Sequence, residues 1–196
     1  MYFTHSLVGA LFVKPIIDKA EDKFTQKEKV VLWFAGITGS VLPDFDLVYT
    51  IFHGLGNHRY FATHGIFLYI ILYLLLYFIG LLHERNEFGR KFFKTLALVT
   101  ILGVFSHFVI DFFIGGIAIF SPFSEIIYGL SIYYDRQTHN WLFRYLTSSY
   151  MLVEFINLVV FFKVLKDKKY FFARIISLGY VVIAMFMFVL VSIIFS

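Results

Sequence analysis

The chain of 196 residues has no cysteine and few charges. The absence of cysteine excludes disulfide bonds and thiolate metal ligands. Only 15% of the residues are charged, against about a quarter in soluble domains, whereas 60% are hydrophobic and 21% aromatic. Since a soluble domain of this length could not bury so much apolar surface, the sequence predicts a single integral membrane domain over residues 1–196.

Six apolar segments predict an all-α fold, a polytopic membrane bundle of about six transmembrane helices. They cover residues 2–17, 30–42, 65–82, 95–116, 146–162 and 174–195. A span needs about 20 residues, so the first two segments are short, and the second stops at Pro43.

The basic residues give this bundle an orientation. Of the 17 Lys and Arg residues, five lie in 14–29, four in 83–94 and five in 163–174. The other side of the membrane receives only Arg59, Arg136 and Arg144. Cytoplasmic loops carry the excess of basic residues, so we predict a multi-pass protein of the cytoplasmic membrane with both termini outside. The net charge of +4 then faces anionic lipid headgroups, and no nucleic acid partner is expected.

Six ionisable residues gather toward the outer ends of the apolar segments. They are His5, Asp44, Asp46, His64, His107 and Asp111. The members on the first, second and fourth segments lie some 13 to 15 residues from the predicted cytoplasmic border, which is about 20 Å at the helical rise. Because three segments deliver polar groups to one depth, and His64 joins them from the outer rim, we predict one site near the outer face.

The residue types in this group predict a divalent metal site. His107 and Asp111 are four residues apart, so they share a helical face with Cβ atoms about 5–6 Å apart. After the break at Pro43, an extended segment would point Asp44 and Asp46 the same way. Carboxylates cost several kcal/mol in a bilayer unless they are paired or ligated. Imidazole nitrogen with carboxylate oxygen suits zinc above all, or manganese or iron, as one or two ions.

Four short boxes resemble a known family. They are THSLVG at 4–9, LPDFD at 42–46, HRYFATH at 58–64 and SHFVID at 106–111, with SP at 121–122. In this order they resemble the YdjM-like family of membrane-bound, metal-dependent hydrolases, over residues 1–122. His58 and His64 are six residues apart, one more than the family pattern. The H-x-x-x-D box also resembles zinc-dependent phospholipase C enzymes, which implies phosphoester hydrolysis.

The resemblance implies a role for each matching residue. The implied metal ligands are His5, Asp44, Asp46, His64, His107 and Asp111. His58 and Arg59 are implied as groups that contact the ligands or the substrate, and the fork of Arg59 suits a phosphate or carboxylate. Asp44 or Asp46 would orient or deprotonate the attacking water. The implied catalytic set is thus Asp44, Asp46, His58 and Arg59.

We therefore predict a membrane-embedded hydrolase that cleaves a phospholipid or another lipid phosphoester with metal-activated water. Two alternatives stay open. A ceramidase-like amide hydrolase would use similar ligands within helices. A non-enzymatic divalent-cation transporter should place its ligands near the midplane, whereas here the inner halves of the first four segments are nearly all apolar.

Structural interpretations also stay open for several residues. His107 and Asp111 could form a hydrogen-bonded pair between helices, and Asp44 could close the turn after Pro43. Glu154, on the fifth apolar segment, either assists the site or makes an interhelical hydrogen bond. The histidines predicted to have no special role are His53, His83 and His139.

The segment 117–145 is rich in aromatic residues and poor in charges. Aromatic residues of this kind settle at the membrane interface. We predict an interfacial segment, and a lid or groove for an acyl or prenyl chain is compatible with that placement.

Overall fold

The computed structural model describes residues 3–47, 49, 61–82, 87–130 and 145–194. Within these ranges the fold is helical, which confirms the predicted all-α class. The six α-helices of the described ranges are α1 (His5–Lys19), α2 (Gln26–Gly39), α4 (Ile66–Leu82), α5 (Glu87–Ile114), α7 (Ser149–Val164) and α8 (Phe171–Ile194). Each of them overlaps one of the six predicted apolar segments.

Two of these helices are long and apolar enough to cross a membrane. They cover Gly89–Ile114 and Lys168–Leu190, and α4 is a shorter apolar helix. By contrast, α1, α2 and α7 have 15, 14 and 16 residues, or about 21–24 Å at the helical rise, against a hydrocarbon core of about 30 Å. The structure thus supports two spans of the six predicted, because the other helices stop short of span length.

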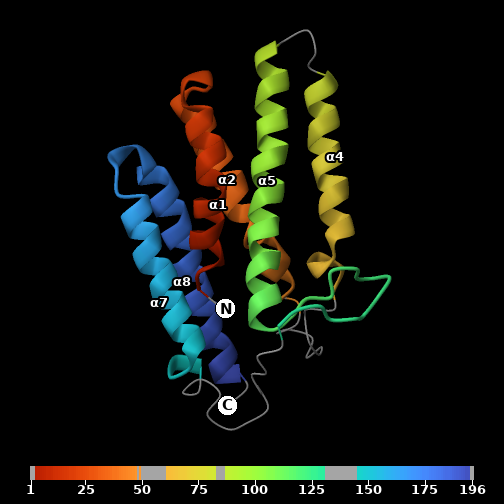
Figure 1. The fold of residues 1–196 in the computed structure, drawn as a ribbon, viewed down its shortest axis with the longest axis vertical. Coiled ribbons are helices and arrows are strands. Elements are labelled where there is room, and N and C mark those ends of the chain that lie inside the picture. The colour runs from red at the N-terminus through yellow and green to blue at the C-terminus, as the bar shows by residue number, and fades with distance from the viewer. Residues whose placement is uncertain (1–2, 48, 50–60, 83–86, 131–144, 195–196) are drawn as a thin grey trace.

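Consecutive helices run in alternating directions, and α1 begins at the same end of the bundle as α8 ends (Figure 1). Helix α5 is central and packs against α1, α2 and α4, while α8 packs against α1 and α2, and α7 packs against α1. The hydrophobic core lies between these helices and includes Leu7, Val13, Leu32, Ile37 and Val99. Four helices thus pack against α1.

Glycines let α2 and α5 approach closely. A Cβ atom added to Gly103 on α5 would lie 2.0 Å from the carbonyl oxygen of Gly36, and one added to Gly39 would lie 2.5 Å from the carbonyl oxygen of Thr100. Small residues at helix contacts are typical of membrane proteins. This contact brings the end of α2, with the segment that follows it, against the second half of α5.

The far end of α1 is tied by polar contacts to the 3-10 helix Lys168–Tyr170, which directly precedes α8. Asp18 accepts hydrogen bonds from Lys14 at 2.5 Å and from the Tyr170 hydroxyl at 2.9 Å. Beside them, Lys169 forms an ion pair with Glu21 at 2.7 Å. Because these groups lie at the end of α1 opposite His5, they fix the packing of α1 without contributing to the polar group predicted near His5.

A short hairpin follows α5. Gly116 turns the chain at φ +78°, and the backbones of Ile117 and Tyr128 then exchange two hydrogen bonds of 2.9 Å. The carbonyl oxygen of Ile119 accepts from the Ile66 amide, so the hairpin covers the start of α4. Phe123 is 80% exposed. This exposed aromatic residue fits the predicted interfacial role for residues 117–130, and the rest of the predicted segment lies outside the described residues.

Candidate metal centre

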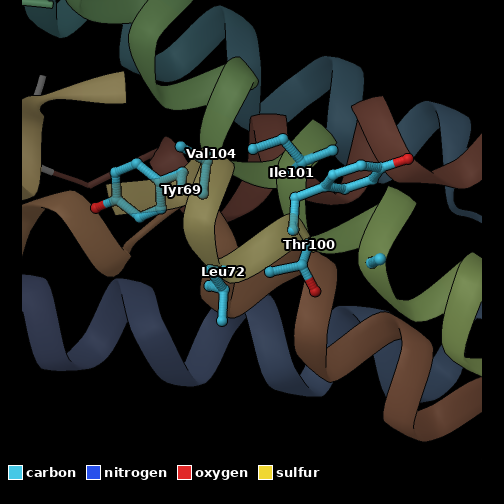
Figure 2. Close-up of a pocket in the computed structure, with 7 residues that line it drawn as sticks. Tyr69, Leu72, Thr100, Ile101 and Val104 are labelled. Atoms are coloured by element: carbon cyan, nitrogen blue, oxygen red, sulfur yellow. The ribbon is translucent and has the colours of Figure 1, made fainter. Parts of the chain in front are cut away.

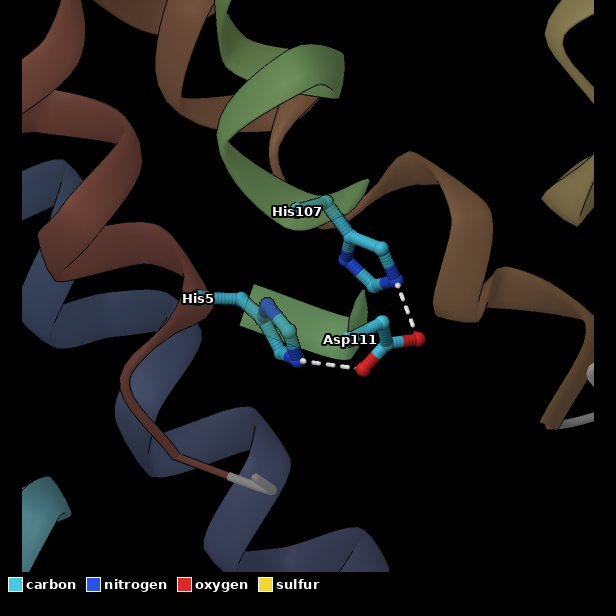
Figure 3. Close-up of side chains that lie close together, drawn as sticks. All are labelled: His5, His107 and Asp111. Carbon is cyan, nitrogen blue, oxygen red and sulfur yellow. Dashed lines mark ion pairs between the residues drawn. The ribbon is translucent and has the colours of Figure 1, made fainter. Parts of the chain in front are cut away.

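The six predicted metal ligands converge at one end of the bundle. Four parts of the chain contribute them: the first residue of α1, the 3-10 helix Leu42–Phe45 with the residue after it, the 3-10 helix Ala62–His64, and the last third of α5. Figure 3 shows His5 of α1 facing His107 and Asp111 of α5. Positions more than 100 residues apart in sequence therefore share one small volume.

Three imidazole Nε2 atoms each face the same two carboxylates. His107 Nε2 lies 3.4 Å from Asp111 and 3.8 Å from Asp44. The Nε2 atom of His5 lies 3.7 Å from Asp44 and 3.9 Å from Asp111, and that of His64 lies 3.7 Å and 3.8 Å from the same residues. We call these three imidazoles and two carboxylates the His₃Asp₂ cluster.

The spacing of this cluster fits a metal ion. Ligand atoms about 2.1 Å from a tetrahedral zinc ion lie about 3.4 Å from one another, which is close to the 3.4–3.9 Å measured between Nε2 and carboxylate oxygens. The Nε2 atom of His107 is buried and makes no hydrogen bond to any described residue. Buried polar atoms ordinarily find a partner, so a ligand for this nitrogen is a natural explanation.

Hydrogen bonds orient two of the three imidazoles from behind. His107 Nδ1 donates to the carbonyl oxygen of Ser40 at 2.9 Å, and His64 Nδ1 donates to Asp46 Oδ2 at 3.0 Å. Thr63 Oγ1 also donates to this oxygen of Asp46. A histidine that binds a metal commonly donates its second N–H in this way, which fixes the ring and the tautomer. Both Nε2 atoms are thereby directed into the cluster.

Electrostatics at His64 reflect its two carboxylate neighbours. Burial disfavours the charged ring, but the Asp44 carboxylate 3.7 Å from Nε2 and the hydrogen bond to Asp46 outweigh burial and raise the pKa of His64 to about 9. In the absence of a metal, the protonated ring offsets part of the negative charge of the aspartates. Metal binding at Nε2 would displace that proton.

The comparison with known families identifies the chain. The sequence model of the YdjM inner membrane protein family matches residues 1–193. The chain belongs to this family. No curated protein and no solved structure matches it. Membership of the YdjM inner membrane protein family confirms the predicted resemblance and extends it from residues 1–122 to nearly the whole chain, while the likeness to phospholipase C enzymes stays a prediction.

The LPDFD box at 42–46 differs from its predicted geometry. The prediction of an extended segment after Pro43 is wrong, since Leu42–Phe45 forms a 3-10 helix. With three residues per turn, positions two apart point about 240° apart around the axis. Asp44 accordingly faces all three Nε2 atoms, whereas Asp46 contacts His64 from behind.

Exposure differs sharply within the cluster. The side chain of Asp44 is 19% exposed, against 0–5% for the three imidazoles and Asp111. Asp44 is therefore the group of the cluster most accessible to water or to a substrate.

Several predicted residues lie outside the described residues. They are His53, His58, Arg59, His83 and His139. The catalytic and substrate-binding roles of His58 and Arg59 stay predictions. Conversely, Ser40 and Thr63 contact the site although no sequence pattern marks them, because Ser40 acts through its backbone carbonyl and Thr63 through a short hydroxyl side chain.

Glu154 connects α7 to the segment that precedes α1 and to Tyr145, which precedes α7. Its side chain, 2% exposed on α7, accepts from the backbone amide of Phe3 at 3.2 Å and from the hydroxyl of Tyr145. The predicted hydrogen bond between helices stays a prediction. The alternative role as a partner of the site also stays a prediction, and Phe3 precedes His5 by two residues.

An apolar crevice between α4 and α5 is not part of the centre (Figure 2). Its lining includes Leu72, Thr100, Ile101 and Val104, and these side chains leave no enclosed space for a molecule the size of water. Ligand pockets are typically about 300–1,000 Å³ and carry convergent polar groups. The crevice is too small and too apolar for a substrate site.

Proposed function

We propose that this protein is a metal-dependent hydrolase of the inner membrane that cleaves a lipid phosphoester near the outer face. The observation that carries the proposal is the buried His₃Asp₂ cluster, in which three Nε2 atoms face two carboxylates at 3.4–3.9 Å. Such a donor set, without thiolates, suits zinc, with manganese and iron as alternatives. A bound divalent ion supplies a Lewis acid that activates water and polarises the scissile bond.

One ion fits the cluster better than two. Two sets of three groups have ligand atoms within 4.8 Å of one another, namely His5 with His107 and Asp111, and Asp44 with His64 and His107. Both sets contain His107, and a single Nε2 atom serves one ion. We therefore propose a mononuclear centre.

The aspartates in and beside the cluster would have different roles in hydrolysis. Asp111, buried between His5 and His107, would hold the ion, and Asp46 would orient His64 through its Nδ1 atom. Asp44 is the more exposed of the two carboxylates of the cluster, so it is placed to accept a proton from the attacking water. Arg59, by its predicted position, would grip the phosphate.

We also propose the predicted six-span topology with both termini outside. The short helices α4 and α7 support it, because both carry exposed apolar side chains along their length, among them Ile71, Phe78, Phe155 and Val159. An exposed apolar face of this kind suits lipid contact. The hairpin after α5 then lies at the outer interface, where a substrate lipid would present its headgroup.

Accessibility to a membrane-impermeant thiol reagent tests this topology. The chain has no native cysteine, so single substitutions report cleanly. Glu125→Cys in the hairpin should label in intact cells, whereas Lys23→Cys and Lys168→Cys should label only after permeabilisation. Labelling of Lys168→Cys from outside would reverse the orientation.

Product analysis tests the chemistry. Purified protein, incubated with mixed phospholipid vesicles, should release a phosphate-bearing headgroup or a diacylglycerol. Release of fatty acid from an amide lipid would instead favour the ceramidase-like reaction. Movement of cation across vesicles without any product would favour transport.

Chain length of the substrate should matter. Since the exposed aromatic residues of the hairpin suit contact with acyl chains, a short-chain, water-soluble analogue should show a lower kcat/KM. Each methylene that loses contact is worth about 0.8 kcal/mol, or roughly fourfold. Equal turnover of short-chain and long-chain substrates in the same detergent would count against a lipid-binding surface.

A further inference from the structure

We propose that α7 and α8 act as a cradle for His5, with Glu154, Asn157 and Ser177 as positioning residues. The proposal rests on the metal site proposed above and assigns a function to the C-terminal third of the chain, where none of the four sequence boxes lies. It concerns the placement of one ligand and not the chemistry of hydrolysis.

His5 differs from the other two imidazoles of the cluster. His64 and His107 each donate from Nδ1 to an oxygen behind the ring, whereas the buried Nδ1 atom of His5 makes no hydrogen bond to any described residue. The His5 ring stacks on that of His107 with centroids 4.0 Å apart and planes at 21°. Stacking fixes the plane of the His5 ring but allows the ring to slide within that plane. The position of the ring must therefore be set by the backbone of His5.

The backbone around His5 is held from α7. The amide of Phe3 donates to Glu154 Oε1 at 3.2 Å, and the hydroxyl of Tyr145 donates to the same oxygen. One helical turn along α7, Asn157 Nδ2 donates to Thr4 Oγ1 at 3.3 Å. Two consecutive residues immediately before His5 are thereby attached to a helix 150 residues away in sequence.

Helix α8 holds the residue on the other side of His5. Ser6 Oγ donates to the carbonyl oxygen of Ser177 at 3.0 Å, and Ser177 Oγ donates to the carbonyl oxygen of Ser6 at 3.3 Å. Both serines are buried. Helix α1 has no side-chain cap at Thr4, so these contacts replace a local cap in fixing its first turn.

A structural role alone explains this arrangement poorly. A buried carboxylate in a membrane helix costs several kcal/mol unless it is paired or functional, and apolar side chains would join α7 to α1 without that cost. The cradle instead directs hydrogen bonds to residues 3, 4 and 6, which flank a metal ligand. Groups that orient a ligand typically change metal affinity 10–100-fold when they are removed.

Cobalt(II) titration of the purified full-length protein tests the cradle without any activity assay. Glu154→Leu should weaken cobalt binding about 10–100-fold and alter the visible spectrum of the bound ion, because one imidazole is displaced. Glu154→Gln keeps an oxygen acceptor for Phe3 and Tyr145, so it should restore near wild-type affinity and spectrum. Phe155→Leu, at an exposed neighbouring position on α7, is the matched control and should change neither.

A double-mutant cycle separates positioning from general destabilisation. In a His5→Ala background, Glu154→Leu should cause no further loss of cobalt affinity, because its effect acts through His5. Should Glu154→Leu fail to fold, the pair Asn157→Leu and Ser177→Ala carries the same comparison. The cradle would be refuted if the losses of cobalt affinity in the cycle were additive. It would also be refuted if Glu154→Leu left the cobalt spectrum unchanged while His5→Ala altered it. Either result would leave the proposed metal site intact. Absence of cobalt binding by the wild type would refute both.

Discussion

His107→Ala will yield a purified protein without stoichiometric divalent metal and without lipid hydrolysis. His107 is fully buried, its Nε2 atom faces both Asp44 and Asp111, and it belongs to both sets of candidate ligands. Removal of this imidazole leaves two carboxylates close together without a shared cation. We expect metal affinity to fall by more than about 100-fold, beyond the range typical of groups that only orient a ligand.

A graded series separates ligands from orienting groups. Asp111→Asn should resemble His107→Ala, because the amide is a poor metal ligand. Asp46→Asn should retain metal with about 10–100-fold weaker affinity, since Asp46 contacts His64 Nδ1 at 3.0 Å and lies behind the ring. Metal content by elemental analysis and hydrolysis of vesicle lipid are measured on the same samples.

Asp18→Asn is the matched control for Asp111→Asn. Asp18 is also an aspartate on a helix of the bundle, but it bonds to Lys14 and Tyr170 at the opposite end of α1. This variant should keep both metal and activity. If wild-type protein purified without chelators holds no divalent metal, and His107→Ala is as active as wild type, the cluster is a hydrogen-bond network and the proposed function is wrong.

The convergence of the site could be predicted from the sequence because helical rise is nearly constant. Counting residues from the predicted cytoplasmic border placed His5, Asp44 and His107 at one depth, and the four-residue spacing placed Asp111 beside His107. In the structure the Nε2 atoms of His5 and His107 each lie within 4 Å of both Asp44 and Asp111. The depth of a residue in the membrane and the helical face on which it lies both follow from the periodicity of the helix. Both can therefore be predicted from a single sequence.

The division of labour between Asp44 and Asp46 could not be predicted. It depends on whether the chain after Pro43 is extended or turns as a 3-10 helix, and proline is compatible with both. The role of Ser40 in orienting His107 could not be predicted either, because every residue has a backbone carbonyl and the sequence does not show which one accepts the hydrogen bond. Glu154 was recognisable as unusual in an apolar segment, but its partner Phe3 could be found only from the packing of α7 on α1.

Helix lengths were the weakest part of the fold prediction. Hydropathy located each apolar segment, yet α1 and α2 have 15 and 14 residues. The ends of α2 are set by the capping box of Thr25 with Glu28 and by the break before Pro43. Local capping thus decides the ends of a helix, whereas hydropathy reports only that an apolar segment exists.

Gly103→Ala will destabilise the protein and also weaken its metal site. A Cβ atom at this position would lie 2.0 Å from the carbonyl oxygen of Gly36, and because backbone atoms cannot rotate away, α2 and α5 must separate. Overpacking of this kind costs about 3 kcal/mol or more. For a chain of this size, that lowers Tm in detergent by roughly 6–12 °C.

The effect on the metal site follows from Ser40, the second residue that the added Cβ atom of Gly103→Ala would approach. The added Cβ atom would also lie 3.0 Å from the Ser40 amide nitrogen, and the carbonyl of Ser40 accepts from His107 Nδ1. Displacement of Ser40 removes the oxygen that orients His107, so zinc affinity should fall together with Tm.

Gly179→Ala is the control, because nothing lies within 4 Å of its added Cβ atom, and alanine favours helix over glycine by about 1 kcal/mol. It should keep Tm and zinc affinity at or above wild-type values. A Gly103→Ala protein with unchanged Tm would show that α2 and α5 do not meet at this glycine. The hydrogen bond from His107 to Ser40, which depends on that contact, would then be wrong as well.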